Sequence, residues 1–242
     1  MAYIFNSAKM AAHCLAAKKV LIMLTLHHLE HSRSFRILWA LEELDVEYQM
    51  EYYQRRPNMA APKALKNLHP LGKAPILTDD ALVIAESAVI LDYLQQHYDT
   101  AQQFKPANTK DVIQYNYWMH YAEGSLMPYL VFSLVMQQLS KKPVPKLARP
   151  VTGFVGQQVF KQFIQPRLYE HVEFLEEYLS HNDYFAGEFS FADIQMSFPL
   201  MGLVEIPKLP ALPHVQAYLA RIKQRSAFLT AQRKSPDSGR VI

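Results

Sequence analysis

Hydrophobic and polar residues follow strand and helix periodicities in the first part of the chain, and helical periodicity alone in the second part. Between residues 23 and 98, short apolar runs typical of strands alternate with amphipathic helical segments. Strands are expected at 23–29, at 46–53, and as a hairpin over 74–84 that turns at Asp79–Asp80. Helices are expected at 34–44, 62–68 and 86–98. The order β-α-β-α-β-β-α predicts a small α/β domain over 23–98.

The remainder of the chain predicts an all-helical domain. Residues 99–109 are polar, contain a proline and are expected to form a linker. The helical domain is expected over 110–225, where no convincing strand is found. Its expected helices are 110–139 with a kink at Pro128, 157–180, 190–205 and 212–225, with a proline-containing loop at 141–150. Residues 226–242 are basic, and we expect a solvated C-terminal tail.

Composition and charge exclude several classes of protein. Half of the 242 residues are hydrophobic, which is enough for a substantial core. The net charge is only +3, with basic and acidic residues interleaved, so nucleic acid is not an expected partner. No run approaches the roughly 18 apolar residues of a membrane span. The single cysteine, Cys14, excludes an intramolecular disulfide and favours the reducing cytoplasm.

Residues 1–22 form a separate segment with no acidic residue and three lysines. A targeting peptide was therefore considered, but Lys18–Lys19 follow the apolar run, which is the wrong order for a secretory signal. Met23 stands directly before the first strand. We expect residues 1–22 to be a disordered extension or a start-site artefact.

The corner between the first strand and the first helix carries candidate chemistry. Ser32 and Ser34 stand at a helix start beside Arg33 and Arg36. Helix N-termini favour negative charge, and a hydroxyl there can donate to a bound anion. The alternative is purely structural, since serine is a common helix N-cap.

Two other helix starts contain similar groups. Glu86 and Ser87 stand at the start of the helix at 86–98. They are either a first-turn cap or a ligand-binding pair, in which the carboxylate binds a cation and the hydroxyl binds an anion. Ser190 and Asp193 have the spacing of a capping box. We therefore expect Asp193 to have a structural rather than a catalytic role.

An α/β unit followed by a helical unit is the outline of the cytosolic glutathione transferases, and five segments resemble that family at its spacing. They are "SRSFRILWALEEL" (32–44), "HPLGKAPIL" (69–77), "AESAVILDYL" (85–94), "HYAEGSLMP" (120–128) and "YFAGEFSFADIQMSFPL" (184–200). The chain most resembles the serine-type members and the related bacterial and fungal branch. The resemblance implies a thioredoxin-like N-terminal domain and an all-helical C-terminal domain.

The resemblance assigns Ser32 as the catalytic residue, which donates a hydrogen bond to the glutathione thiolate. Ser34 is the alternative donor, and Arg33 could add to the field around the sulfur. No Tyr or Cys lies between residues 23 and 47, so the other nucleophile-activating residues of the family are absent. A cysteine-dependent oxidoreductase of this fold is disfavoured for the same reason.

The resemblance also implies five glutathione-binding residues. A cis bond before Pro75 would expose the backbone of Ala74 to the cysteinyl part of the peptide. Ala74 is a mild departure, because valine is usual there. Lys73 would meet the glycyl carboxylate. Ser87 would take the γ-glutamyl carboxylate, while Glu86 pairs with the α-ammonium.

The second substrate is expected to be a small apolar electrophile, with organic hydroperoxides as a further possibility. Tyr117, Tyr121 and Met127 are the predicted wall of its pocket. Glutathione is a co-substrate, and neither a metal nor another cofactor is implied. A homodimer is expected. The alternative function is a non-catalytic module of the same fold that binds glutathione or an apolar ligand.

Overall fold

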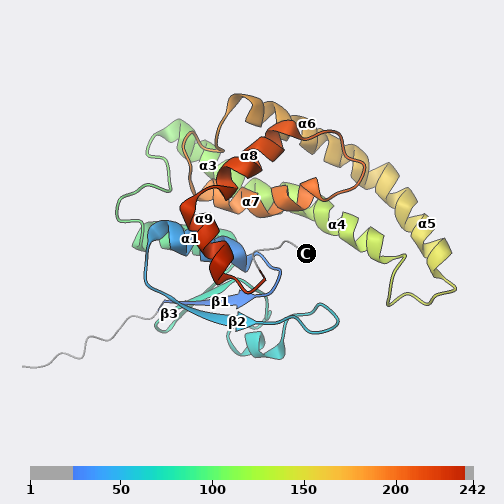
Figure 1. Ribbon diagram of the computed structural model, residues 1–242, viewed down its shortest axis with the longest axis horizontal. Helices are drawn as coiled ribbons and strands as arrows, with labels where there is room; N and C mark the ends of the chain where they lie inside the picture. The colour runs from blue at the N-terminus through green and yellow to red at the C-terminus, as the bar shows by residue number, and fades with distance from the viewer. Residues whose placement is uncertain (1–23, 238–242) are drawn as a thin grey trace, which may run out of the picture.

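The computed structural model describes residues 24–237, which form two units packed against each other (Figure 1). The first unit contains a four-stranded sheet in the order β2-β1-β3-β4. Its elements are β1 (Thr25–Leu29), α1 (Ser34–Leu44), β2 (Gln49–Tyr53), the 3₁₀ helix η1 (Lys63–Asn67), β3 (Ile76–Asp79), β4 (Leu82–Ala85) and α2 (Ser87–His97). The predicted order of elements is confirmed, with η1 as the second helix. The segment 1–22 lies outside the described residues.

Strand β1 is an inner strand, and its position fixes the corner that follows it. It pairs in parallel with β2, with Leu26 opposite Met50, and antiparallel to β3, with Leu26 opposite Leu77. Leu26 and Leu77 are fully buried. A parallel pair needs a crossover connection, and α1 supplies it. The chain must therefore turn sharply after Leu29, which places Ser32 at the end of the sheet.

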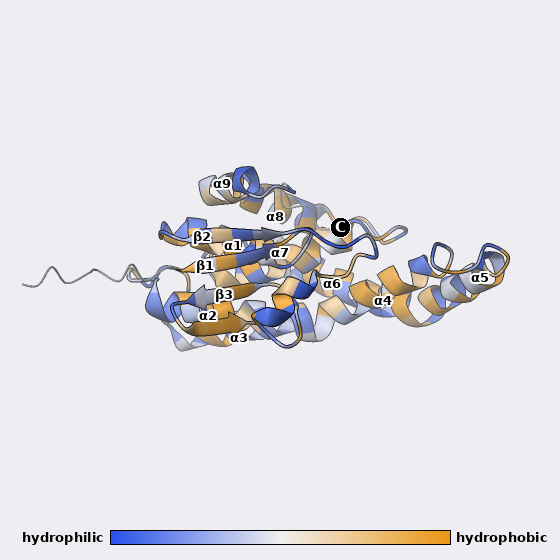
Figure 2. Cartoon of the chain, turned by 90° about the horizontal axis from the view of Figure 1, so that it is seen from below, coloured by the Kyte–Doolittle hydropathy of each residue, from blue (hydrophilic) through white to orange (hydrophobic). Residues whose placement is uncertain are grey.

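The second unit is helical, as predicted. It contains α3 (Thr109–Tyr121), the π turn η2 (Ala122–Leu126), α4 (Met127–Gln138), α5 (Arg149–Val159), the π turn η3 (Phe160–Ile164), α6 (Gln165–His181), α7 (Phe191–Val204), α8 (Pro213–Lys223) and α9 (Ser226–Lys234). Helix α7 is buried on nearly every side and forms the centre of this unit. Helices α4 and α5 extend beyond the rest of the molecule (Figure 2).

One helix prediction is confirmed and another needs correction. The helix expected over 110–139 is a continuous helical segment over 109–138, in which the π turn η2 ends directly before Met127 and Pro128. Proline lacks a backbone N–H and disturbs the regular hydrogen-bond ladder of a helix, so the π turn lies where the sequence predicted an irregularity. The helix expected at 157–180 already begins at Arg149 and contains η3.

The capping box at the start of α7 is confirmed. The Asp193 carboxylate accepts the backbone N–H of Ser190 at 2.8 Å, that of Phe185 at 3.0 Å and the Tyr218 hydroxyl at 3.0 Å. Both halves of the reciprocal Ser190–Asp193 pair are present. Asp193 is fully buried among these partners, which is the structural role that the sequence predicted.

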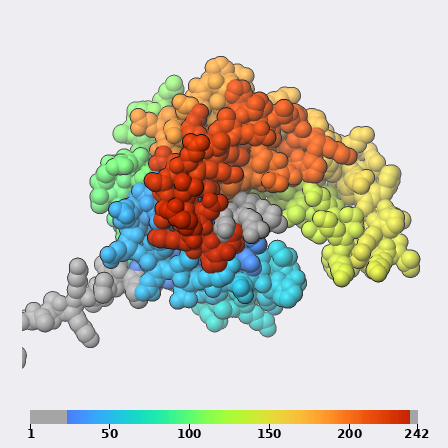
Figure 3. All heavy atoms as spheres, in the orientation of Figure 1, coloured from blue at the N-terminus to red at the C-terminus, as the bar shows by residue number. Residues whose placement is uncertain are grey.

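The expectation of a solvated C-terminal tail is wrong for residues 226–237. Residues Ser226–Lys234 form α9, which lies against α1, and the space-filling view shows this end of the chain covering part of the first unit (Figure 3). Phe228 is buried, with its ring 5.3 Å from that of Phe35 and 5.0 Å from that of Trp39. The prediction was wrong because it treated the basic residues as solvated, whereas Arg225 and Lys234 form ion pairs with α1.

Those ion pairs hold both ends of α9. Arg225 donates to both carboxylate oxygens of Glu43, at 2.6 and 2.9 Å. Lys234 donates to Glu42 at 2.6 Å. Within residues 24–237, no helix combines the length and the apolar composition required to cross a bilayer.

Candidate functional site

A cavity of about 470 Å³, called the main cavity below, lies where the two units meet. The first unit contributes the loop before β3 and the start of α2, and the second contributes α3, η2 and α7. All five residues that the sequence assigned to glutathione line it, namely Lys73, Ala74, Pro75, Glu86 and Ser87. The fold therefore brings two separate sequence motifs into one wall.

The loop before β3 has the backbone geometry that the sequence predicted. The Ala74–Pro75 peptide bond is cis. Ile76 follows directly as the first residue of β3 and is fully buried between β1 and β4. The sheet thus holds this loop from behind, while Ala74 remains partly exposed at the cavity.

The start of α2 presents a buried hydroxyl to the main cavity. Ser87 is 4% exposed, and its Oγ has no hydrogen-bond partner among the described residues. No side chain caps α2, so the purely structural explanation of Glu86 and Ser87 as caps is not supported by the geometry. Glu86 has φ = 72°, a left-handed value that is uncommon for a non-glycine residue. An unpaired buried hydroxyl costs about 1–3 kcal/mol, which a ligand acceptor at this position would recover.

A cluster of two arginines and one carboxylate crosses from α1 to η2 beside the cavity. Arg36 is fully buried and donates to Glu123 Oε1 at 2.6 Å and to Gln195 Oε1 at 3.2 Å. Arg33 donates to the same Glu123 oxygen at 3.0 Å. Arg33, Glu123 and Gln195 all line the main cavity.

The charges of this cluster stabilise one another. Burial lowers the pKa of Arg36 to about 10, and Glu123 opposes that decrease, so Arg36 is cationic at neutral pH. Burial raises the pKa of the Glu123 carboxyl, but attraction to Arg36 and Arg33 outweighs burial and holds the pKa below its usual value. The sequence analysis missed Glu123 as a site residue. The available signal was a single acid inside the otherwise weakly charged segment 117–136.

The serine corner lies behind Arg33. Ser32 is 7% exposed, its Oγ donates to the Leu29 carbonyl at 2.8 Å, and it accepts the backbone N–H of Ser34 at 3.2 Å. Ser34 is fully buried and faces His28 rather than the main cavity, with its Oγ 2.8 Å from His28 Nδ1. Neither serine is among the residues that line the main cavity, whereas Arg33 between them is.

The expected second-substrate residues are not brought together. Tyr117 and Tyr121 stack at 5.6 Å and contact Phe174 of α6, and Tyr121 also shares a hydrogen bond with His171. Met127 lines a second, more apolar cavity of about 260 Å³. Helix α3 and η2 instead present another set to the main cavity, namely Met119, His120, Glu123 and Gly124.

Within residues 24–237, no group of three or more His, Cys, Asp or Glu side chains has an arrangement that could hold a metal ion.

Comparisons with known proteins agree with this arrangement. The family model described as glutathione S-transferase, N-terminal domain, matches residues 23–96, and the model for the C-terminal domain matches residues 125–226. Glutathione S-transferase 3 of Schizosaccharomyces pombe is 35% identical over 221 residues, which is 89% of each chain. Glutathione S-transferase 1 of Saccharomyces cerevisiae is 30% identical over 224 residues, or 88% of this chain and 95% of that one.

Solved structures give the same result. A glutathione S-transferase from Actinobacillus pleuropneumoniae superimposes with a TM-score of 0.68 at 32% identity, covering 88% of this chain and 92% of that chain. Both family models match in the expected order, and the related proteins align over most of their length. On these grounds, the chain belongs to the glutathione S-transferase family.

Proposed function

We propose that this glutathione S-transferase catalyses attack of the glutathione thiolate on an electrophilic carbon of small apolar substrates, with organic hydroperoxides, attacked at oxygen, as a second class of substrate. The observation that supports the proposal most is the buried, unpartnered hydroxyl of Ser87 in the main cavity beside Glu86. The Ser87 hydroxyl can donate a hydrogen bond to a ligand, and the adjacent Glu86 carboxylate can bind a cationic group. The α-carboxylate and α-ammonium of a γ-glutamyl group meet these two needs.

The rest of the peptide would lie along the loop before β3. We propose that the backbone of Ala74 pairs with the cysteinyl part and that Lys73 meets the glycyl carboxylate. This arrangement directs the sulfur toward Arg33 and Ser32 at the start of α1. All these contacts use protein groups, so the proposal requires no metal and no cofactor other than glutathione as co-substrate.

Ser32 is the proposed catalytic residue. Its Oγ–H, which donates to the Leu29 carbonyl in this structure, would turn to the thiolate. Lowering a thiol pKa by about two units requires roughly 2.7 kcal/mol of preference for the thiolate. A helix N-terminus contributes up to ~2 kcal/mol and a charge-assisted hydrogen bond ~1.5–3 kcal/mol, which together suffice.

The electrophile would occupy the part of the main cavity bordered by Met119 and Gly124. This replaces the predicted wall of Tyr117 and Tyr121, which pack against α6 instead. Met127 stays a candidate through the neighbouring apolar cavity, which also contains Phe198. The Arg33 guanidinium lies 5.7 Å from the Phe198 ring, so this aromatic residue contacts both regions.

A homodimer and a cytoplasmic location are further proposals. Exposed apolar side chains on α4 and α5 support the first, namely Val131, Phe132, Val135, Val151, Phe154 and Val155. Light scattering after size exclusion would give twice the chain mass for a dimer. The single cysteine supports a reducing compartment.

The test of the proposed activity is a turnover panel with glutathione. It would contain a chloronitroarene, an isothiocyanate and cumene hydroperoxide. We expect turnover of at least one of the three. Measurable glutathione binding with no turnover of any of them would instead support the alternative, a non-catalytic glutathione-binding module.

A further inference from the structure

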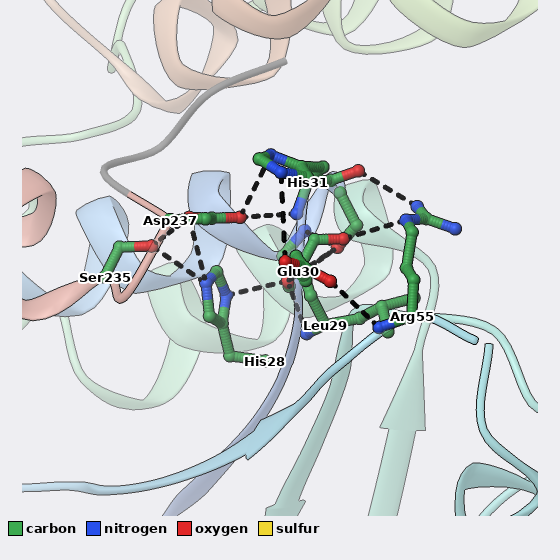
Figure 4. A network of polar contacts seen from close by, with 9 residues as sticks. His28, Leu29, Glu30, His31, Arg55, Ser235 and Asp237 are labelled. Atoms are coloured by element: carbon green, nitrogen blue, oxygen red, sulfur yellow. Dashed lines mark hydrogen bonds and ion pairs between the residues drawn. The ribbon is translucent and has the colours of Figure 1, made fainter. Parts of the chain in front are cut away.

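A continuous series of hydrogen-bonding side chains leads from Ser32 to the C-terminal segment, residues 235–237. Ser32 Oγ lies 2.7 Å from Ser34 Oγ, which lies 2.8 Å from His28 Nδ1. On the other side of the imidazole, His28 Nε2 lies 3.0 Å from Ser235 Oγ, and Ser235 donates to the Asp237 carboxylate. Figure 4 shows the His28 side chain, which belongs to β1, beside Ser235 and Asp237 of this segment. Residues more than 200 positions apart thus form one relay.

The relay is shielded from water. His28 and Ser34 are fully buried, and Ser32, Ser235 and Asp237 are each less than a tenth exposed. Asp237 is held over the corner by a second contact, because its carboxylate also accepts the backbone N–H of His31. The C-terminal segment therefore covers the His28 side chain and the backbone of His31.

The hydrogen-bond directions follow from the groups at the far end. An ionised carboxylate only accepts, so the single Ser235 hydroxyl hydrogen points to Asp237. His28 Nε2 must then carry a hydrogen and donate to Ser235. In the neutral imidazole this leaves Nδ1 as an acceptor for the Ser34 hydroxyl, so the relay is oriented to accept a proton at His28.

We propose that His28 accepts the proton of the glutathione thiol through the hydroxyls of Ser32 and Ser34. The inference rests on the proposed function. For the transfer, the Ser32 hydroxyl hydrogen turns from the Leu29 carbonyl to Ser34 Oγ, which is 2.7 Å away. The S–H proton then moves to Ser32 Oγ, the Ser32 proton to Ser34 Oγ, and the Ser34 proton to Nδ1. Each hydroxyl gains one proton and loses one, so the products are a thiolate and an imidazolium, with no oxidation or reduction. After transfer, the Ser32 hydroxyl donates to the thiolate.

Asp237 is the positioning residue of this relay. Its Oδ1 lies 3.9 Å from His28 Nε2, where its charge favours the imidazolium, as the aspartate of a Ser-His-Asp triad does. Tyr52 of β2 is another titratable neighbour of the His28 ring, at 5.8 Å between ring centroids. Glu30 and Arg55 lie farther out in the same network, where Arg55 donates to the carbonyls of Glu30 and His31.

Counting protons and thiolates in the same titration tests the proposal. Calorimetry of glutathione binding in buffers of different ionisation enthalpy gives the protons released at neutral pH, and ultraviolet absorbance gives the thiolates formed. S-methylglutathione supplies the correction for protons that do not come from the thiol. We expect the wild-type protein to release well under one proton per thiolate, because His28 retains the rest. One proton released per thiolate would overturn the relay.

Two variants and one control sharpen the test. His28→Gln should raise the release to one proton per thiolate, and Asp237→Asn should raise it part of the way. His171→Gln, which removes a half-buried histidine bonded to the Tyr121 hydroxyl, should leave the wild-type ratio. If His28→Gln does not fold, the wild-type ratio and Asp237→Asn still decide. An unchanged ratio in Asp237→Asn and in folded His28→Gln contradicts the relay. Absence of any thiolate in the wild type instead contradicts the proposed function.

Discussion

At the residue scale, Glu86 is the side chain whose charge should matter most for binding. Glu86→Gln keeps its shape but removes the partner of the ligand's α-ammonium, so glutathione binding should weaken by about 1.5–3 kcal/mol. Calorimetry should show a similar loss with S-methylglutathione, which has no ionisable thiol. An analogue without the α-ammonium should lose much less. Equal losses for glutathione and for the analogue without the α-ammonium would place Glu86 outside the binding site. The matched control is Glu177→Gln, at an exposed position.

Asp193 should affect stability rather than activity. Asp193→Ala removes the acceptor of two backbone N–H groups and of the Tyr218 hydroxyl. The free energy of unfolding should fall by about 1 kcal/mol or more. Turnover per folded molecule should stay within a few-fold of wild type, measured after chemical denaturation gives the folded fraction. A stable but inactive variant would contradict the structural role.

The titration of Asp193 also predicts a pH dependence. Burial raises the pKa of this carboxyl to about 6, although its hydrogen bonds oppose the increase. The folded state then binds more protons than the unfolded state between about pH 4 and 6, so the stability contributed by this group decreases as pH rises through that window. Two pKa units at about 1.36 kcal/mol each put the effect on the order of 3 kcal/mol. Unfolding curves of Asp193→Asn should lack this decrease, and an identical pH profile would contradict the shift.

At the scale of elements, α9 is predicted to stabilise the first unit. Phe228 is buried against Phe35 and Trp39 of α1. Phe228→Ala should therefore cost about 3–5 kcal/mol in the free energy of unfolding. The neighbouring Leu229→Ala is the control, because Leu229 is largely exposed and should cost much less. If urea denaturation showed an equally small loss of unfolding free energy for Phe228→Ala and Leu229→Ala, the packing of Phe228 would not stabilise the first unit.

The elements that the sequence predicted are those whose own periodicity specifies them. Helix α1 and the hairpin of β3 and β4 were expected at nearly their observed bounds. Helix α9 was missed because its basic residues suggested solvent exposure, although their partners, Glu42 and Glu43, lie far away in the sequence. The π turn η2 was not expected as such, although it ends two residues before Pro128, where the sequence predicted a kink.

The site shows the same division. Lys73, Ala74, Pro75, Glu86 and Ser87 were expected because two short motifs resemble the glutathione transferases, and the structure places all five in the wall of the main cavity. The residues of α3 that line the main cavity, Met119 and His120, were not predicted, because Tyr117 and Tyr121 were expected there instead. Which side of α3 faces the cavity depends on its contacts with α6 and α7, and no local pattern reports these. The relay to Asp237 was missed for the same reason.

At the scale of the whole molecule, the two units are joined by the pair of Arg36 and Glu123. Glu123→Gln removes the charge that compensates a fully buried guanidinium, and because the Glu123 side chain is 35% exposed, unfolding should become easier by about 1–2 kcal/mol, less than for a fully buried pair. Attraction to Arg36 and Arg33 holds the pKa of Glu123 low, so its stabilisation is present above its unfolded pKa and is lost as pH falls through the folded value. Denaturation of the variant should therefore differ from wild type near neutral pH and converge with it in acid. A difference that persists unchanged in acid would exclude the charge as its cause.

The measurement that tests the central claim most directly is the titration of the bound glutathione thiol. Thiolate absorbance against pH would be recorded for wild type, Ser32→Ala and the surface control Ser180→Ala, after the folded fraction of each is checked. Ser32→Ala deletes the donor to the sulfur, so the bound thiol should titrate higher by about one unit or more, while Ser180→Ala should match wild type. If Ser32→Ala titrates as the wild type does, the Ser32 hydroxyl is only a structural cap and the account of thiolate activation is wrong.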